Sequence, residues 1–259
     1  MNRIDQLFEN KRTGILSVYM TAGFPELDDT IDIVQTLQLS GVDMIEIGMP
    51  FSDPLADGPV IQESSQKAIK NGMTINLLFK QLEIIRSSVD IPLILMGYLN
   101  PVLQFGFDRF VIKCKEVGID GLIIPDLPLT IYKNDFRRKV ENAGLHFIML
   151  ITPQTSIDRI KEISESSGGF LYMVADSTTT GGRKKINNLQ ISYFKKVEAL
   201  KLDKPGLIGF GIYDNETFNI ACKYANGAII GSAFINKLKE GNESSVKEKS
   251  ANFVKSILQ

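Results

Sequence analysis

The sequence contains no tryptophan and only one histidine and two cysteines among its 259 residues. A site in which several histidines bind a metal is therefore excluded, because His146 is the only imidazole in the chain. Cys114 and Cys222 lack the spacing of metal ligands, so we expect both to be reduced thiols of a cytosolic protein. No metal site is predicted.

Long apolar segments and a surplus of one charge are also absent. No run approaches the roughly 18 apolar residues that a membrane-spanning helix needs, and Met1–Asp5 lacks the apolar core of a signal peptide. The 29 lysines and arginines nearly balance the 30 aspartates and glutamates. These features argue against a membrane surface or a nucleic acid as the main partner, and we expect a cytoplasmic protein.

Eight short apolar runs recur along the chain, and each is followed by a polar loop and a segment with helical periodicity. The runs hardly alternate, as is typical of parallel strands that are covered on both faces. Eight strand–helix units in about 250 residues favour one (β/α)8 TIM barrel domain over residues 1–259, with a doubly wound sheet as the alternative. The runs are Ile15–Thr21, Asp43–Gly48, Leu93–Gly97, Gly121–Pro125, Phe147–Thr152, Phe170–Ala175, Gly206–Gly211 and Gly227–Gly231.

Glu46 stands out as a carboxylate inside an apolar run, close to that run's C-terminal end. Active sites of TIM barrels lie at this end of the strands. Burial should raise the pKa of Glu46 towards neutrality, which suits a group that both takes and gives a proton. A buried glutamate that a neighbouring loop satisfies is an equally good interpretation at this stage.

The loop that follows Glu46 carries two more carboxylates, Asp53 and Asp57, in the stretch PFSDPLADGP. Its prolines and its Asp-Gly pair are typical of a stiff, turned segment, so turn formation alone could explain both residues. Because the loop lies beside Glu46, a second carboxylate at the same end of the barrel is plausible. Two acids in different environments can divide the roles in a reaction.

Two glycine-containing pairs at the ends of the last two runs suggest a phosphate site. Gly209 and Gly211 end the seventh run, and Gly231 and Ser232 end the eighth just before a predicted helix. Loops after strands 7 and 8 and a helix N-terminus form the usual phosphate site of TIM barrels. Each pair alone could be a turn.

None of the eight runs contains lysine, which disfavours an aldolase that forms an imine. The only histidine, His146, opens a run at the opposite end of the barrel.

The sequence resembles the α subunits of tryptophan synthase. Residues Glu46–Gln62, EIGMPFSDPLADGPVIQ, are close to the signature of that family, and a chance match to so long a motif is very improbable. The resemblance extends over nearly the whole chain through the segments Thr21–Pro25, Gly97–Pro101, Pro125–Pro128 and Gly209–Ile212.

The resemblance implies roles for individual residues. Glu46 matches the proton-transferring glutamate, and Asp57 matches the aspartate that holds the indole N–H and stabilises the cationic intermediate. Tyr19 stands where the family often has phenylalanine against the indole. The positions that line the substrate, including the candidates for an apolar wall, are Tyr19, Met96, Tyr98, Leu127, Ile151, Tyr172 and Thr180, and those near its phosphate are Gly181, Gly209, Gly211, Gly231 and Ser232.

The reaction that the resemblance implies is the cleavage of indole-3-glycerol phosphate to indole and D-glyceraldehyde 3-phosphate in L-tryptophan biosynthesis. It is a retro-aldol reaction in which indole protonated at C3 is the electron sink and a base removes the proton of the C3′ hydroxyl. No metal or cofactor is expected in this chain. An αββα complex with a β subunit that carries pyridoxal phosphate is implied, with Asp53, Asn100 and Pro128 near the contact.

One segment departs from the family pattern. The family commonly reads Ser-Arg-x-Gly-Val-Thr-Gly after the sixth strand, whereas this chain reads ADSTTTG and keeps only the final Thr180-Gly181. The sequence therefore does not decide whether this loop closes over the site or whether it communicates with a partner. The alternatives are a regulatory subunit that activates the β subunit without cleaving substrate, a stand-alone lyase of the same fold, and an unrelated phosphosugar isomerase or epimerase.

Overall fold

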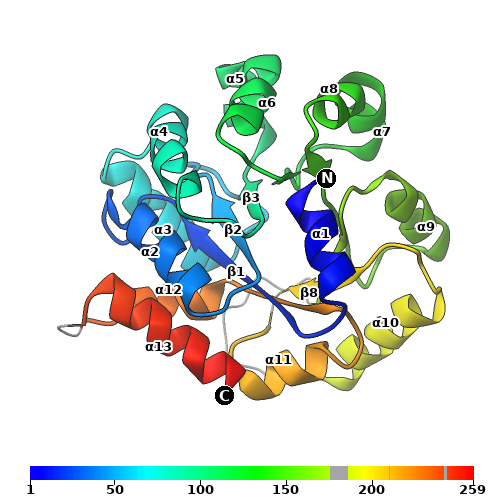
Figure 1. Cartoon of the computed structure of the whole chain (residues 1–259). Coiled ribbons are helices and arrows are strands. Elements are labelled where there is room, and N and C mark those ends of the chain that lie inside the picture. Colours follow the sequence, from blue (N-terminus) through cyan, green and yellow to red (C-terminus); the bar gives the residue numbers. More distant parts are fainter. Residues whose placement is uncertain (176–185, 210, 242–243) are drawn as a thin grey trace.

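The computed structural model describes residues 1–175, 186–209, 211–241 and 244–259. Parallel strands form its centre and helices surround them (Figure 1). The strands are β1 (Ile15–Thr21), β2 (Met44–Gly48), β3 (Leu93–Met96), β4 (Gly121–Ile123), β5 (His146–Phe147), β6 (Met149–Ile151), β7 (Leu171–Val174), β8 (Gly206–Gly209) and β9 (Gly227–Ile230).

Apart from the first helix, which precedes β1, the helices follow the strands in the chain and cover their outer face. They are α1 (Arg3–Asn10), α2 (Asp29–Leu39), α3 (Pro59–Lys70), α4 (Ile75–Arg86), α5 (Leu99–Phe105), α6 (Phe107–Glu116), α7 (Leu129–Ile131), the π-helix η1 (Tyr132–Phe136), α8 (Arg137–Asn142), α9 (Ile157–Ser166), α10 (Asn188–Ala199), α11 (Asn215–Ala221), α12 (Ser232–Lys239) and α13 (Val246–Leu258).

The sheet closes through a strand that is split in two. Its order is β5-β4-β3-β2-β1-β9-β8-β7-β6, with parallel pairing throughout, and only Ile148 separates β5 from β6 in the chain. The N–H of Ile148 still donates to Leu122 beside it, but the N–H of Met149 donates to the Ser167 side chain. A side chain thus interrupts the single strand predicted over 147–152. The eight-stranded barrel is confirmed and the doubly wound alternative is wrong.

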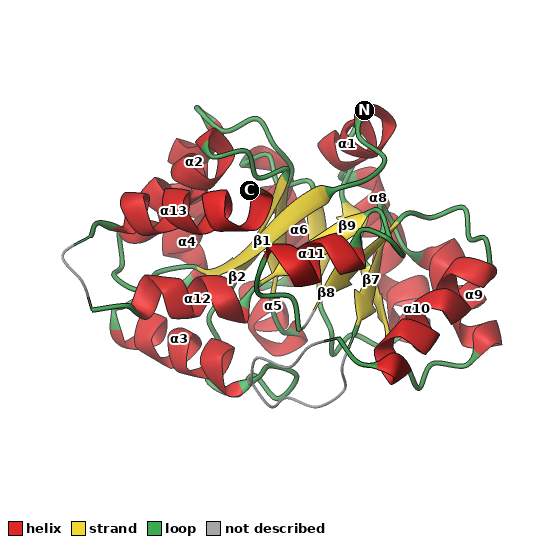
Figure 2. Ribbon diagram, turned by 90° about the horizontal axis from the view of Figure 1, so that it is seen from below, coloured by secondary structure: helices red, strands yellow, loops and turns green. Residues whose placement is uncertain are grey.

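Helix α1 covers the end of the barrel at which the strands begin (Figure 2). Ile4 is completely buried, and its side chain would be 2.9 Å from a Cβ atom on Gly169 and 3.1 Å from one on Gly121. Asp5 accepts a hydrogen bond from His146 Nε2 at 2.8 Å. His146 is therefore a structural residue at the N-terminal end of the barrel, as predicted, and the chemistry has to be sought at the other end.

Candidate active site

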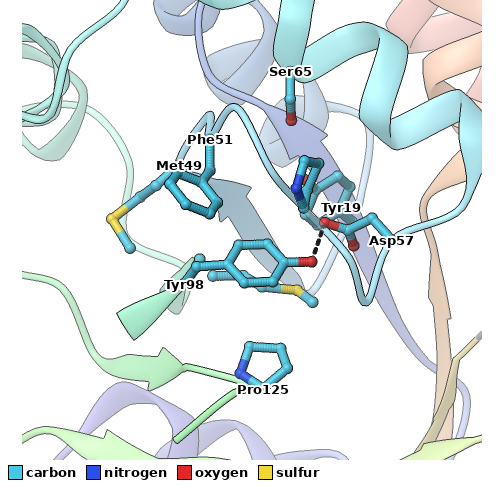
Figure 3. Close-up of a pocket in the computed structure, with 10 residues that line it drawn as sticks. Tyr19, Met49, Phe51, Asp57, Ser65, Tyr98 and Pro125 are labelled. Carbon is cyan, nitrogen blue, oxygen red and sulfur yellow. Dashed lines mark hydrogen bonds between the residues drawn. The ribbon is translucent and has the colours of Figure 1, made fainter. Parts of the chain in front are cut away.

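A pocket lies at the C-terminal ends of β1 to β4. Figure 3 shows Tyr98 and Asp57 pointing towards each other across it, with Tyr19, Phe51 and Pro125 around them. The lining side chains come from two strand ends, from the loop after β2, from α3 and from the segment after β4. They are Tyr19, Met49, Phe51, Pro54, Asp57, Ser65, Met96, Gly97, Tyr98 and Pro125.

Glu46 lies in β2 and is not among the residues that line this pocket. Its side chain is 0% exposed, and its backbone is in register with Tyr19 of β1, which does line the pocket. The Ser17 hydroxyl donates a hydrogen bond to Glu46 Oε1 at 3.2 Å, whereas Oε2 has no partner among the described residues. Burial raises the pKa of Glu46 to about 8, although the Ser17 hydrogen bond opposes the rise. The carboxyl is therefore suited to exchange a proton near neutral pH.

Asp57 is held in the loop after β2 by backbone turns. Its N–H donates to Pro54 O at 3.0 Å, and Gln62 of α3 donates a side-chain hydrogen bond to Asp57 O at 2.9 Å. Helix α3 begins at Pro59, where a missing N–H costs nothing. Burial raises the pKa of Asp57 to about 6, against the effect of a hydrogen bond from Tyr98. Asp57 therefore remains largely ionised at neutral pH.

Tyr98 connects the loop after β2 to the end of β3. Its hydroxyl donates to Asp57 Oδ2 at 2.9 Å and accepts from the N–H of Ala56 at 3.0 Å. Its ring packs on Phe51 with a centroid separation of 5.4 Å. The sequence suggested Tyr98 as part of an apolar wall, but its hydroxyl is a polar contact that orients Asp57.

Tyr19 and Tyr172 lie close enough to both carboxyl groups for the charges of Glu46 and Asp57 to raise their pKa values, although burial is the larger cause. Both phenols are therefore neutral at ordinary pH. A Cβ atom on Gly48 would lie 2.0 Å from the Tyr19 hydroxyl. A Cβ atom on Gly209 would lie 2.4 Å from the Tyr172 hydroxyl. Glycine at these two positions makes room for the tyrosines.

The residues predicted near a phosphate lie at neighbouring strand ends. β8 and β9 are paired, so Gly209 at the end of β8 is close to Gly231, which directly follows β9. Gly231 is the N-cap of α12 and Ser232 is its first residue, so free N–H groups of the helix face this end of the barrel. Gly211 has a φ of 74°, which favours glycine. Thr180 and Gly181, also predicted in the site, lie outside the described residues.

Comparison with known proteins finds relatives of this chain in sequence and in fold. The family described as "Tryptophan synthase alpha chain" matches residues 5–257. The protein of that name from Flavobacterium psychrophilum is 55% identical over 249 residues, which cover 96% of this chain and 98% of the relative. The one from Christiangramia forsetii is 53% identical over 257 residues, covering 99% and 98%. The crystal structure of tryptophan synthase subunit alpha from Legionella pneumophila has a TM-score of 0.89 at 33% identity, covering 99% of this chain and 97% of that one.

The chain belongs to the tryptophan synthase alpha chain family. The resemblance indicated by the segment Glu46–Gln62 is thereby confirmed, together with the family's barrel fold. Of the predicted substrate-binding residues, Tyr19, Met96 and Tyr98 line the pocket with Asp57. Leu127, Ile151 and Tyr172 are buried but do not line it.

Several residues of the site were not predicted from the sequence. Met49, Phe51 and Pro125 line the pocket, and each is adjacent to or inside a segment quoted for the family resemblance. Ser17 was also missed. It is a polar residue in an apolar run, which is the same signal that singled out Glu46.

The three residues predicted near a partner are all exposed and follow neighbouring strands. Asp53 follows β2, Asn100 lies in α5 after β3, and Pro128 precedes α7 after β4.

In the part of the chain that the structure describes, no helix has the length and apolarity to cross a bilayer. The same residues contain no cluster of three or more His, Cys, Asp or Glu side chains that could hold a metal ion.

Proposed function

We propose that the chain cleaves indole-3-glycerol phosphate to indole and D-glyceraldehyde 3-phosphate by a retro-aldol reaction. Membership of the tryptophan synthase alpha chain family makes it a carbon–carbon lyase of tryptophan biosynthesis. The observation that carries the assignment of residues is a completely buried carboxyl, Glu46, in register with Tyr19, which lines a pocket together with a second carboxyl, Asp57.

In the proposed mechanism Glu46 transfers protons and Asp57 stabilises charge. A carboxyl with a pKa of about 8 is partly protonated at neutral pH, so it can give a proton to indole C3 and take one from the hydroxyl of the departing aldehyde carbon. Protonation at C3 makes the indole ring an electron sink for the carbon–carbon bond that breaks. One or both transfers belong to Glu46.

Asp57 complements the positive charge that develops on the indole ring. Its pKa of about 6 leaves it ionised at neutral pH. The hydrogen bond from Tyr98 fixes the position of Oδ2 at the wall of the pocket. A fixed carboxylate in a site with little water interacts strongly with a developing cation. Tyr19 and Met96 supply apolar surface against which an indole ring can lie.

The phosphate of the substrate is proposed to bind where β8 and β9 end. The N–H groups at the start of α12, next to Gly231 and Ser232, favour an anion there. Gly209 and Gly211 border the same place, and Thr180 and Gly181 belong to the proposed site by sequence alone. Binding of the phosphate makes the cleavage effectively intramolecular.

A β subunit is the proposed partner, in an αββα complex, with pyridoxal phosphate in that subunit and no cofactor in this one. Leu55 is 88% exposed, Leu103 is 48% exposed and Ile131 is 41% exposed. These side chains lie in the same three segments as Asp53, Asn100 and Pro128. Exposed apolar side chains in segments that follow neighbouring strands support a docking surface. A cytoplasmic location fits this role.

The test is indole release from indole-3-glycerol phosphate by the purified chain, alone and with the β subunit of a related tryptophan synthase. Slow release that rises strongly with the β subunit supports the proposal. Equal rates in both conditions would favour the stand-alone lyase. Absence of release in both, with activation of the β subunit retained, would overturn catalysis and leave the regulatory subunit.

A further inference from the structure

Ser17 is a polar residue in the centre of β1, and its side chain is completely buried. A buried hydroxyl requires a hydrogen-bond partner. The partner is Glu46 Oε1, at 3.2 Å, and among the described residues this is the one hydrogen bond to the Glu46 side chain. The proposed proton-transferring group is therefore held by a single side chain from the neighbouring strand.

The register of the two strands explains this contact. Tyr19 is paired with Glu46, and Ser17 precedes Tyr19 by two residues, which places it on the same face of β1. Ser17 therefore lies one layer deeper in the barrel than the residues that line the pocket. It reaches Oε1 from below, and Oε2 is left without a hydrogen-bond partner from the described residues.

We infer that Ser17 is a positioning residue that fixes Oε1 of Glu46, so that Oε2 is the oxygen that exchanges protons with the substrate. The inference rests on the proposed function. When Glu46 acts as the base, the substrate O–H bond breaks and an Oε2–H bond forms. The electrons of the O–H bond form the aldehyde carbonyl, and those of the broken carbon–carbon bond return to the protonated indole. Ser17 keeps its own proton throughout.

The Ser17 hydroxyl can donate to Oε1 in both states of Glu46, but it donates more strongly to the carboxylate. This hydrogen bond opposes the rise in pKa that burial causes, so its loss should raise the pKa of Glu46 further. Of the residues that the structure describes, three other titratable groups face this region, namely Tyr19 of β1, Tyr172 of β7 and Asp57 after β2. The tyrosines stay neutral because burial raises their pKa values, and Asp57 titrates at about 6, well separated from Glu46.

The experiment compares the pH dependence of indole release for the wild type and Ser17→Ala. We expect a roughly tenfold lower kcat at pH 7 and a shift of the Glu46 limb by about one pH unit to higher pH. The KM should change less than about twofold, since Ser17 does not contact the substrate. Ser17→Thr keeps a hydroxyl and should recover most of kcat. Ser250→Ala is the matched control, because it removes an equally buried serine hydroxyl that donates to Val246 O within α13.

Titration of the Glu46 carboxyl by infrared difference spectroscopy, with Glu46→Gln as the reference, gives a readout that needs no activity. The titration should move to higher pH in Ser17→Ala and stay in place in Ser250→Ala. In the Glu46→Gln background, Ser17→Ala should cause no further loss of rate. A Ser17→Ala chain that folds, cleaves and titrates like the wild type would overturn the inference. A wild type that titrates as expected but does not cleave would overturn the proposed function instead.

Discussion

The two ends of the barrel each contain a buried carboxyl group, and their surroundings are opposite. Within the described part of the chain, Glu46, near the C-terminal end, receives one hydroxyl hydrogen bond and has one oxygen without a partner. Asp120, at the N-terminal end, is 3% exposed. It accepts hydrogen bonds from Arg3 and Arg86, each at 3.0 Å, and from the N–H of Leu93 at 2.9 Å.

This contrast teaches that burial alone does not decide what a carboxyl group does. Two guanidinium groups and a backbone N–H satisfy Asp120, so it joins α1, α4 and β3 as a structural ion pair. None of the described residues places a cation beside Glu46, so desolvation dominates and its pKa rises to about 8. Completeness of the polar contacts separates the residue that holds the fold from the residue that can do chemistry.

The largest effect is expected for Glu46→Gln. The amide keeps the shape of the side chain but cannot exchange protons, so we expect indole release to fall by about 10³-fold. The unfolding midpoint should not fall, because no ion pair is lost. Steady-state assays and thermal unfolding measure both quantities. A variant that keeps a tenth of the wild-type rate would show that Glu46 is not the main proton-transferring group.

Asp120→Asn should give the reverse result. Removing the charge leaves the Arg86 guanidinium poorly compensated, since Arg86 is largely buried, and we expect the free energy of unfolding to fall by about 3 kcal/mol. Denaturant unfolding measures this loss. Lys113→Gln is the control, because its ion pair with Glu116 lies on the surface, where solvent screens it and its loss should leave the stability almost unchanged.

The pH dependence of stability sharpens the contrast further. The pKa of Glu46 rises from 4.5 to about 8 on folding, so between these values the folded chain holds a proton that the unfolded chain has released. Stability from this group is therefore lost as pH rises through that window. The stability of Glu46→Gln relative to the wild type should increase from pH 5 to pH 8, by about 3.5 kcal/mol. A constant difference would contradict the raised pKa.

The smallest effect is expected for Tyr98→Phe. The ring can still pack on Phe51, but the hydrogen bond to Asp57 is lost. The pKa of Asp57 should rise above about 6, and we expect kcat/KM to fall about tenfold at neutral pH. Tyr224→Phe, in the segment before β9, is the control. If kcat/KM is unchanged in Tyr98→Phe, Asp57 does not depend on this contact.

Local sequence patterns predicted the strands and the carboxyl groups. Apolar runs that do not alternate indicated buried parallel strands, and Glu46 was visible as a charge inside one of them. The contacts that tune the site were not predictable in this way. Tyr98 and Asp57 are 41 residues apart and Ser17 and Glu46 are 29 apart, so no local periodicity encodes them. The split between β5 and β6 likewise depends on the Ser167 side chain, which is distant in sequence.

The most direct test of the contrast is to measure indole release by Glu46→Gln and Asp120→Asn side by side, below both unfolding midpoints. The account predicts that Asp120→Asn keeps more than about half of the wild-type kcat, whereas Glu46→Gln keeps about a thousandth. Comparable losses of kcat in the two folded variants would contradict the division between a structural and a catalytic end of the barrel.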